Sequence, residues 1–259
     1  MIIKRDLYYW PVQENRTLHI YLPDDYYYTN ERYPVMYMFD GHNLFFDEDA
    51  TYGKCWGIKD FLDHYSKKMI VVGMECSHHD HDRLNEYSPY HKRMFGHYIE
   101  GIGEKTFEWI MYNVKPMIDS EYRTYGFREA TGIGGSSMGG LMSIYGIIRH
   151  NQVFSKAACL STGIFHNISN LRKDLASSDL SPDTKIYMSW GEIESGRAAH
   201  NGNPAYDTRE ARSVRKFERE LQEKSADTYI YFQPGGRHCE EDWQKQVPLF
   251  MNYLWLNIK

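Results

Sequence analysis

A series of short apolar runs constrains the fold of this chain most strongly. Four of them are PVMYMF (34–39), MIVVGM (69–74), KAACLS (156–161) and KIYMSW (185–190). Continuous apolar runs of this length are typical of strands buried on both faces of a sheet. The later runs are separated by segments with helical spacing, which predicts parallel strands connected by crossover helices. We therefore expect an α/β chain with one mostly parallel sheet and helices on both of its faces.

Four further segments complete a predicted sheet of about eight strands. IIKRDLYYW (2–10) and TLHIYL (17–22) can pair antiparallel at one edge, EATGI (129–133) is short, and TYIYFQ (228–233) is the last strand. Helices are predicted over 56–68, 98–118, 138–150, 207–224 and 241–259, with a long polar loop over 75–97. Since the chain shows no internal repeat and no Pro-, Gly- or Ser-rich linker, we expect a single domain over residues 1–259.

The charge and cysteine content argue against several classes of protein. The net charge is −5 without a basic stripe, which disfavours a nucleic-acid partner, and no long apolar run predicts a membrane span. The start of the chain, MIIKRDLYYW, lacks the apolar stretch of a signal peptide, so we expect a cytoplasmic protein. The four cysteines are scattered without a CxxC pair, which predicts reduced thiols.

The stretch GIGGSSMGGL (132–141) is the first candidate for chemistry. It is not a Walker loop, because no Gly-Lys pair follows, and it lacks the third glycine of a dinucleotide fingerprint. It does contain G-x-S-x-G from Gly135 to Gly139, between a predicted strand and an apolar helix. This motif holds a serine at a sharp strand-to-helix turn, which makes Ser137 the candidate nucleophile and Ser136 a spacer. The alternative is a tight turn with a surface serine.

A serine nucleophile needs a histidine base and an acid that orients it. GEIESG (191–196) follows the strand KIYMSW and offers Glu192 and Glu194, of which we favour Glu194; Asp207 is a more remote alternative. PGGRHCEEDW (234–243) follows the last strand and offers His238. Each candidate lies at the carboxyl end of a predicted strand, where open α/β sheets bind ligands.

Several longer motifs resemble one known family over nearly the whole chain. YPVMYMFDGHNLF, YGKCWGI, RLNEYSP, GGSSMGGL and GGRHCEEDW are similar to motifs of the esterase family that contains enterochelin esterase-like and esterase D-like proteins. That family is related to the feruloyl and acetylxylan esterases of carbohydrate esterase family 1 and to the mycolyltransferases. The resemblance implies an α/β-hydrolase fold and a serine esterase that needs no cofactor.

The resemblance also implies roles for individual residues. Ser137 would be the nucleophile, His238 the base and Glu194 the acid, although Glu192 stands where relatives carry a small hydroxyl residue. The oxyanion hole would be formed by the backbone N–H groups of Met138 and His42. Two preorganised donors of this kind contribute about 3 kcal/mol each to transition-state stabilisation.

Other polar and aromatic residues have two interpretations each. Arg83 and Glu86 either form a wall of the substrate cleft or brace the loop that carries them. Trp56 either stacks on the substrate or belongs to the core. Arg197 and His200 are candidates for contact with an acidic substrate group, against the simpler interpretation as exposed loop residues. The histidine-rich stretch CSHHDHDRLNEY (76–87) lacks a known metal-ligand spacing, so we expect a solvated loop and no metal.

These observations predict a serine carboxylic ester hydrolase that acts on a small or sugar-linked acyl ester through an acyl-enzyme. The expected partner is a small-molecule or oligosaccharide ester. An acyltransferase on the same scaffold and a non-catalytic binding protein on a hydrolase fold are the alternatives. The natural ester and the oligomeric state do not follow from the sequence.

Overall fold

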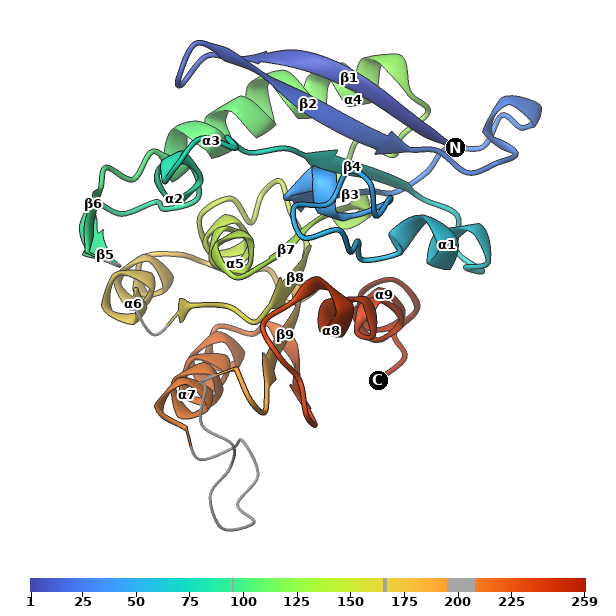
Figure 1. The fold of residues 1–259 in the computed structure, drawn as a ribbon. Coiled ribbons are helices and arrows are strands. Elements are labelled where there is room, and N and C mark those ends of the chain that lie inside the picture. Colours follow the sequence, from blue (N-terminus) through green and yellow to red (C-terminus); the bar gives the residue numbers. More distant parts are fainter. Residues whose placement is uncertain (95, 165–166, 195–207) are drawn as a thin grey trace.

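Eight strands form one sheet in the computed structural model of the protein, which describes residues 1–94, 96–164, 167–194 and 208–259 (Figure 1). Their order across the sheet is β1-β2-β4-β3-β7-β8-β9-β10. The bounds are β1 Ile2–Tyr9, β2 Glu14–Tyr21, β3 Val35–Phe39, β4 Ile70–Met74, β7 Thr131–Ser136, β8 Lys156–Leu160, β9 Lys185–Gly191 and β10 Asp227–Gln233.

The sheet is parallel except at one edge. β1 pairs antiparallel with β2, and β2 pairs antiparallel with β4, whereas every neighbouring pair from β4 to β10 is parallel. The central strands β3 and β4 are buried along their whole length, as their continuous apolar sequences predicted, and so is the glycine-rich strand β7. The prediction of a mostly parallel sheet of about eight strands is therefore confirmed.

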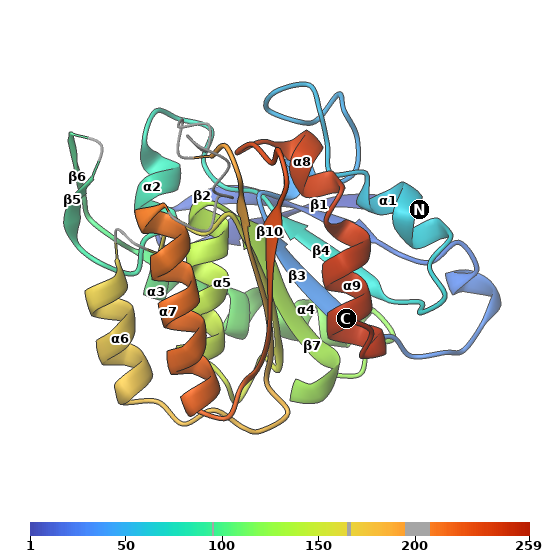
Figure 2. The ribbon, with the colours of Figure 1, turned by 90° about the horizontal axis from the view of Figure 1, so that it is seen from below.

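Helices cover both faces of this sheet (Figure 2). One face packs against α3 Gly103–Trp109, a π-helical turn over Ile110–Val114, α4 Lys115–Glu121, α5 Met138–Arg149, α6 Ile168–Ala176 and α7 Arg209–Glu223. The other face packs against α1 Ile58–Asp63, α8 Glu240–Gln244 and α9 Val247–Leu256. Each face has its own cluster of buried apolar side chains, so the sheet separates two hydrophobic cores.

The segment after β4 contains more regular structure than its polar sequence predicted. It holds α2, Asp82–Glu86, and a small hairpin of β5, Lys92–Met94, with β6, His97–Ile99. The helix predicted from residue 98 begins at Gly103, because residues 97–99 pair as a strand and Gly101 has a φ of +71° that a helix does not accept.

The predicted C-terminal helix is divided into α8 and α9. Pro248 lies in the first turn of α9, where a missing N–H costs nothing, but it could not continue a helix from α8. Among the described residues, no helix combines the length and the apolarity needed to cross a bilayer, and the cytoplasmic location stays a prediction. The four cysteines are free thiols, as predicted.

Candidate active site

Ser137 lies at the turn between β7 and α5 in a backbone conformation that few residues adopt. Its φ is +57° and its ψ is −117°, although it is not glycine. The turn is fixed by two hydrogen bonds: Ser137 N donates to the Leu160 carbonyl at 3.0 Å, and Leu141 N donates to the Ser137 carbonyl at 3.0 Å. A strained serine that precedes a helix N-terminus has the geometry of a nucleophile elbow.

The glycines of the motif allow the two arms of this turn to approach each other. A Cβ atom added to Gly135 would lie 2.9 Å from the Gly139 carbonyl carbon, and one added to Gly139 would lie 3.0 Å from Cβ of Phe39. Backbone atoms that close cannot move aside without changing the turn. The spacing G-x-S-x-G is therefore a packing requirement of the elbow.

We expect Gly135→Ala to lower the free energy of unfolding by about 1–3 kcal/mol, because the added methyl group has no room. Urea denaturation followed by circular dichroism measures the change. Gly163→Ala is the matched control, since a Cβ atom there meets nothing within 4 Å and the loss should be small. Equal stability of the two variants would contradict the packing argument.

The loops after β9 and β10 bring a carboxylate and an imidazole together. His238 Nδ1 lies 3.0 Å from Glu194 Oε2, and because a carboxylate accepts, Nδ1–H is the donor. Glu194 keeps only 1% of its side-chain surface exposed, whereas His238 keeps 42%. The hydrogen bond places the proton on Nδ1 and leaves Nε2 free to accept a proton from another group.

Two other donors hold the Glu194 carboxylate. Ser161 Oγ and the backbone N–H of Gly191 both donate to Glu194 Oε1 at 2.6 Å. Ser161 Oγ in turn accepts a hydrogen bond from Trp243 Nε1 at 2.7 Å, and the Trp243 ring packs edge to face against His238 at 5.1 Å between centroids. Ser161 was not predicted as a site residue, although its position directly after β8 was a signal that it lies near the site.

The alternative acid, Glu192, points elsewhere. Its Oε2 accepts a hydrogen bond from the backbone N–H of Gly235 at 2.7 Å and so joins the loops after β9 and β10. The structure therefore brings Glu194, and not Glu192, to His238. Arg197, His200 and Asp207 lie outside the described residues.

Ser137 and His238 line the same cavity, which has a volume of about 560 Å³. In the part of the chain that the structure describes, no hydrogen bond joins their side chains. Catalytic hydrogen bonds are often long before substrate binds and tighten in the complex, so this separation is compatible with a serine–histidine pair. Most of the residues that line the cavity are polar, among them Asn43, Thr51, Tyr52, Ser77, His78 and Arg83.

The amides predicted for an oxyanion hole lie on two different elements. Met138 is the first residue of α5, so its N–H has no acceptor within the helix. His42 lies in a short 3₁₀ turn, Gly41–Asn43, directly after β3. A Cβ atom on Gly41 would lie 2.4 Å from the Gly73 carbonyl carbon, so a glycine at this position lets the turn lie close against β4. His42 itself lines the cavity.

The sequence of the chain matches the sequence model of one protein family. This model, described as "Putative esterase", matches residues 11–251 of the chain. The chain belongs to this esterase family. Since the match covers the elbow and both loops that carry Glu194 and His238, it includes the whole candidate site. The protein is a serine esterase, and ester hydrolysis is its class of reaction.

Individual relatives of the esterase are distant. Protein YbbA of Bacillus subtilis (strain 168), which is uncharacterised, is 25% identical over 184 residues, or 70% of this chain and 69% of the relative. An IroE-like serine hydrolase from Shewanella oneidensis has a TM-score of 0.74 at 19% identity, covering 98% of this chain and 81% of the other. The enterobactin esterase FES from Shigella flexneri has a TM-score of 0.75 at 14% identity, covering 99% and 60%. At these identities the two structures establish the shared fold.

An ion pair braces the cavity wall of the esterase. Arg83 Nε and Nη2 donate to the two carboxylate oxygens of Asp40, each at 2.7 Å, and the guanidinium packs on the Tyr87 ring. Burial alone would raise the pKa of Asp40, but the Arg83 guanidinium outweighs burial and holds the pKa below its ordinary value. Arg83 thus braces the loop and also lines the cavity, which combines the two interpretations given from the sequence.

We expect Arg83→Met to destabilise the esterase by about 3 kcal/mol at neutral pH, because it leaves the Asp40 carboxylate buried without a partner. This value is at the lower end for such pairs, since Arg83 keeps 30% of its side chain exposed. In the parent protein the depressed pKa adds stability above the ordinary Asp pKa, and this stability is lost as the pH falls through the depressed value. In the variant, burial without the guanidinium raises the pKa of Asp40. As the pH falls, Asp40 of the variant therefore takes up a proton, and the variant gains stability relative to the parent.

Urea unfolding of both proteins from neutral pH down to about pH 5 measures this difference, which should narrow as the pH falls. The double variant Arg83→Met/Asp40→Asn should recover most of the loss at neutral pH. A difference that stays constant with pH, with no recovery in the double variant, would show that Arg83 acts through packing alone.

Two residues predicted to contact the substrate do not lie on the cavity. Trp56 is 2% exposed and packs on Trp243 in the core beneath α9, so the core interpretation describes its position. Glu86 is also 2% exposed, pairs with Arg16 of β2 and accepts a hydrogen bond from Ser77 N at 3.0 Å. We therefore correct the expectation that these two side chains contact substrate, because each is enclosed by protein partners.

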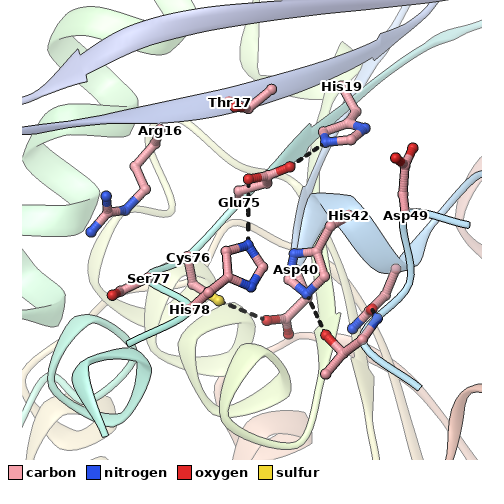
Figure 3. A network of polar contacts seen from close by, with 12 residues as sticks. Arg16, Thr17, His19, Asp40, His42, Asp49, Glu75, Cys76, Ser77 and His78 are labelled. Atoms are coloured by element: carbon pink, nitrogen blue, oxygen red, sulfur yellow. Dashed lines mark hydrogen bonds and ion pairs between the residues drawn. The ribbon is translucent and has the colours of Figure 1, made fainter. Parts of the chain in front are cut away.

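A polar network lies beside the predicted oxyanion turn (Figure 3). The Cys76 thiol points at the Asp40 carboxylate with a separation of 3.5 Å, and the His42 imidazole lies beside both. The ligand atoms of Asp40, His42 and Cys76 lie within 4.8 Å of one another, a spacing that a metal ion could bridge. However, Arg83 already binds both Asp40 oxygens, and burial raises the pKa of the Cys76 thiol and disfavours the thiolate that a metal needs. We retain the prediction that the esterase uses no metal.

Proposed function

We propose that this esterase cleaves a small or sugar-linked acyl ester through an acyl-enzyme on Ser137, with His238 as general base and Glu194 as the orienting acid. One observation carries the proposal: Glu194 bonds to the Nδ1 side of an imidazole that shares a cavity with the strained serine. The bond leaves His238 Nε2 as the acceptor for the Ser137 hydroxyl proton, which is the role of the imidazole in a catalytic triad.

The reaction then proceeds in two similar halves. His238 Nε2 takes the proton of Ser137 Oγ as Oγ attacks the ester carbonyl carbon, and the resulting oxyanion accepts hydrogen bonds from the amides of Met138 and His42. The C–O bond breaks and the leaving alcohol takes the proton from His238. Water repeats the sequence on the acyl-enzyme and releases the carboxylic acid.

The cavity supports an ester of modest size. Its volume of about 560 Å³ lies within the range of sites for small organic ligands, and its wall carries hydroxyl, amide and imidazole groups instead of a continuous apolar lining. These features favour a polar, compact substrate.

Hydrolysis of short-chain p-nitrophenyl esters tests the proposal. We expect turnover of the acetyl ester, falling as the acyl chain lengthens, with free carboxylic acid as the main product even when a short alcohol is added. A new ester as the main product would indicate an acyltransferase instead. The absence of turnover for every ester in the series would contradict the proposed function.

A further inference from the structure

Glu240 is a carboxylic acid in the cavity that the proposed mechanism does not use. It is the first residue of α8, two positions after His238, and it lines the same cavity as Ser137 and His238. The residue is only 6% exposed, so its charge is largely removed from bulk water. A buried acid is costly unless a partner compensates it, which makes its surroundings informative.

No such partner is present among the described residues. No other side chain in that part of the chain forms a hydrogen bond or an ion pair with the Glu240 carboxylate, and its own backbone amide is the one hydrogen-bond donor acting on it. Burial raises the pKa of Glu240 and the nearby Asp40 carboxylate adds to the increase, while His238 and Arg83 oppose it. The other buried acids near the site differ, since Asp40 pairs with Arg83 and Glu194 with His238.

The position of Glu240 indicates which part of a substrate it faces. His238 returns a proton to the leaving alcohol, so the alcohol must lie next to the imidazole during the reaction. Glu240 follows His238 by two positions, lines the same cavity, and is close enough to His238 for the imidazole to act on the pKa of its carboxyl group. An unpaired carboxylate there accepts hydrogen bonds from a bound molecule and repels a negative charge.

We propose that Glu240 selects the alcohol portion of the ester, accepting hydrogen bonds from an uncharged alcohol that carries several hydroxyl groups and excluding an anionic one. This inference rests on the proposed function and specifies its substrate class. A sugar monoester satisfies the Glu240 carboxylate together with the neutral polar groups of Asn43, Thr51 and Tyr52 on the same cavity. A cationic alcohol is the other class that a carboxylate attracts, and the test below includes one for that reason.

Four acetyl esters with different alcohol portions test the proposal, with acetate release as the readout. They are 6-O-acetylglucose, cyclohexylmethyl acetate, which has a similar ring without hydroxyl groups, O-acetyllactate, which is anionic, and acetylcholine. We expect Glu240→Ala to lower kcat/KM for acetylglucose by about tenfold or more, since a hydrogen bond to a charged group is lost, and to change it less than about twofold for cyclohexylmethyl acetate. We expect Glu240→Gln, which keeps the shape and removes the charge, to raise kcat/KM for acetyllactate by about tenfold.

Glu241→Gln is the matched control. Glu241 is the next residue of α8, but it is exposed and pairs with Arg237 outside the cavity, so the four rates should stay unchanged. Equal losses for all four esters in Glu240→Ala would overturn the proposal, because that pattern indicates disturbance of His238. A loss of kcat/KM for acetylcholine but not for acetylglucose in Glu240→Ala would overturn the proposal as well. If the parent protein hydrolyses none of these esters or any p-nitrophenyl ester, the proposed function itself fails.

Discussion

Replacing Ser137 with alanine is expected to lower kcat for ester hydrolysis by about 10⁴- to 10⁶-fold, since loss of the nucleophile removes the covalent pathway and leaves only binding and oxyanion stabilisation. KM should change little, because the serine hydroxyl is small and contributes mainly to the chemical step. Steady-state kinetics with p-nitrophenyl acetate measure both constants. The folded structure should persist, since the hydrogen bonds that fix the elbow come from the Ser137 backbone and not from its side chain.

Ser136→Ala is the matched control for this variant. Ser136 is the neighbouring serine, the last residue of β7, and it is 4% exposed with no role in the proposed chemistry. It should retain most of its activity. If the two variants lost activity to the same extent, the effect would reflect disruption of the turn, and Ser137 could no longer be assigned as the nucleophile.

Replacing Glu194 with glutamine is expected to lower kcat by about 10³- to 10⁴-fold, the effect seen when a triad acid is converted to its amide. The cause lies in the donors around the carboxylate. Ser161 Oγ and Gly191 N both donate to one oxygen, which favours the amide carbonyl at that position and turns the amide NH₂ toward His238. His238 Nδ1 must then accept, so Nε2 carries the proton and cannot take one from Ser137.

Glu192→Gln separates this effect from a general disturbance of the loop. Glu192 lies in the same loop, and glutamine can still accept the hydrogen bond from Gly235 N through its carbonyl oxygen. Activity should stay within about twofold of the parent, as for a surface substitution away from the chemistry. Comparable losses in both variants would contradict the assignment of Glu194 as the acid.

The positions of the strands along the chain and the position of the elbow could be predicted from the sequence because both depend on local patterns. Buried parallel strands have continuous apolar sequences, and the turn at Ser137 requires glycines where backbones meet. His238 could be proposed because the loop after the last strand of such a sheet must open at the same edge as the elbow.

Side-chain direction within the loops could not be predicted in the same way. Glu192 and Glu194 are two residues apart, and they differ in the donors that their carboxylates meet in the folded chain. The Gly235 amide bonds to Glu192, whereas Ser161 and His238 bond to Glu194. Glu86 appeared to be a candidate for the cleft because the sequence gives no indication that Arg16, 70 residues earlier, points at it. Long-range ion pairs of this kind form only when tertiary packing brings the two residues together, so local sequence patterns do not predict them.

The covalent step on Ser137 can be observed directly. The parent protein is incubated with a fluorophosphonate probe, and mass spectrometry of the intact chain and of its peptides locates the adduct. We predict one equivalent of probe on the peptide that contains Ser137, no labelling in Ser137→Ala, and slower labelling in Glu194→Gln. An adduct on another residue, or undiminished labelling of Ser137→Ala, would contradict the account.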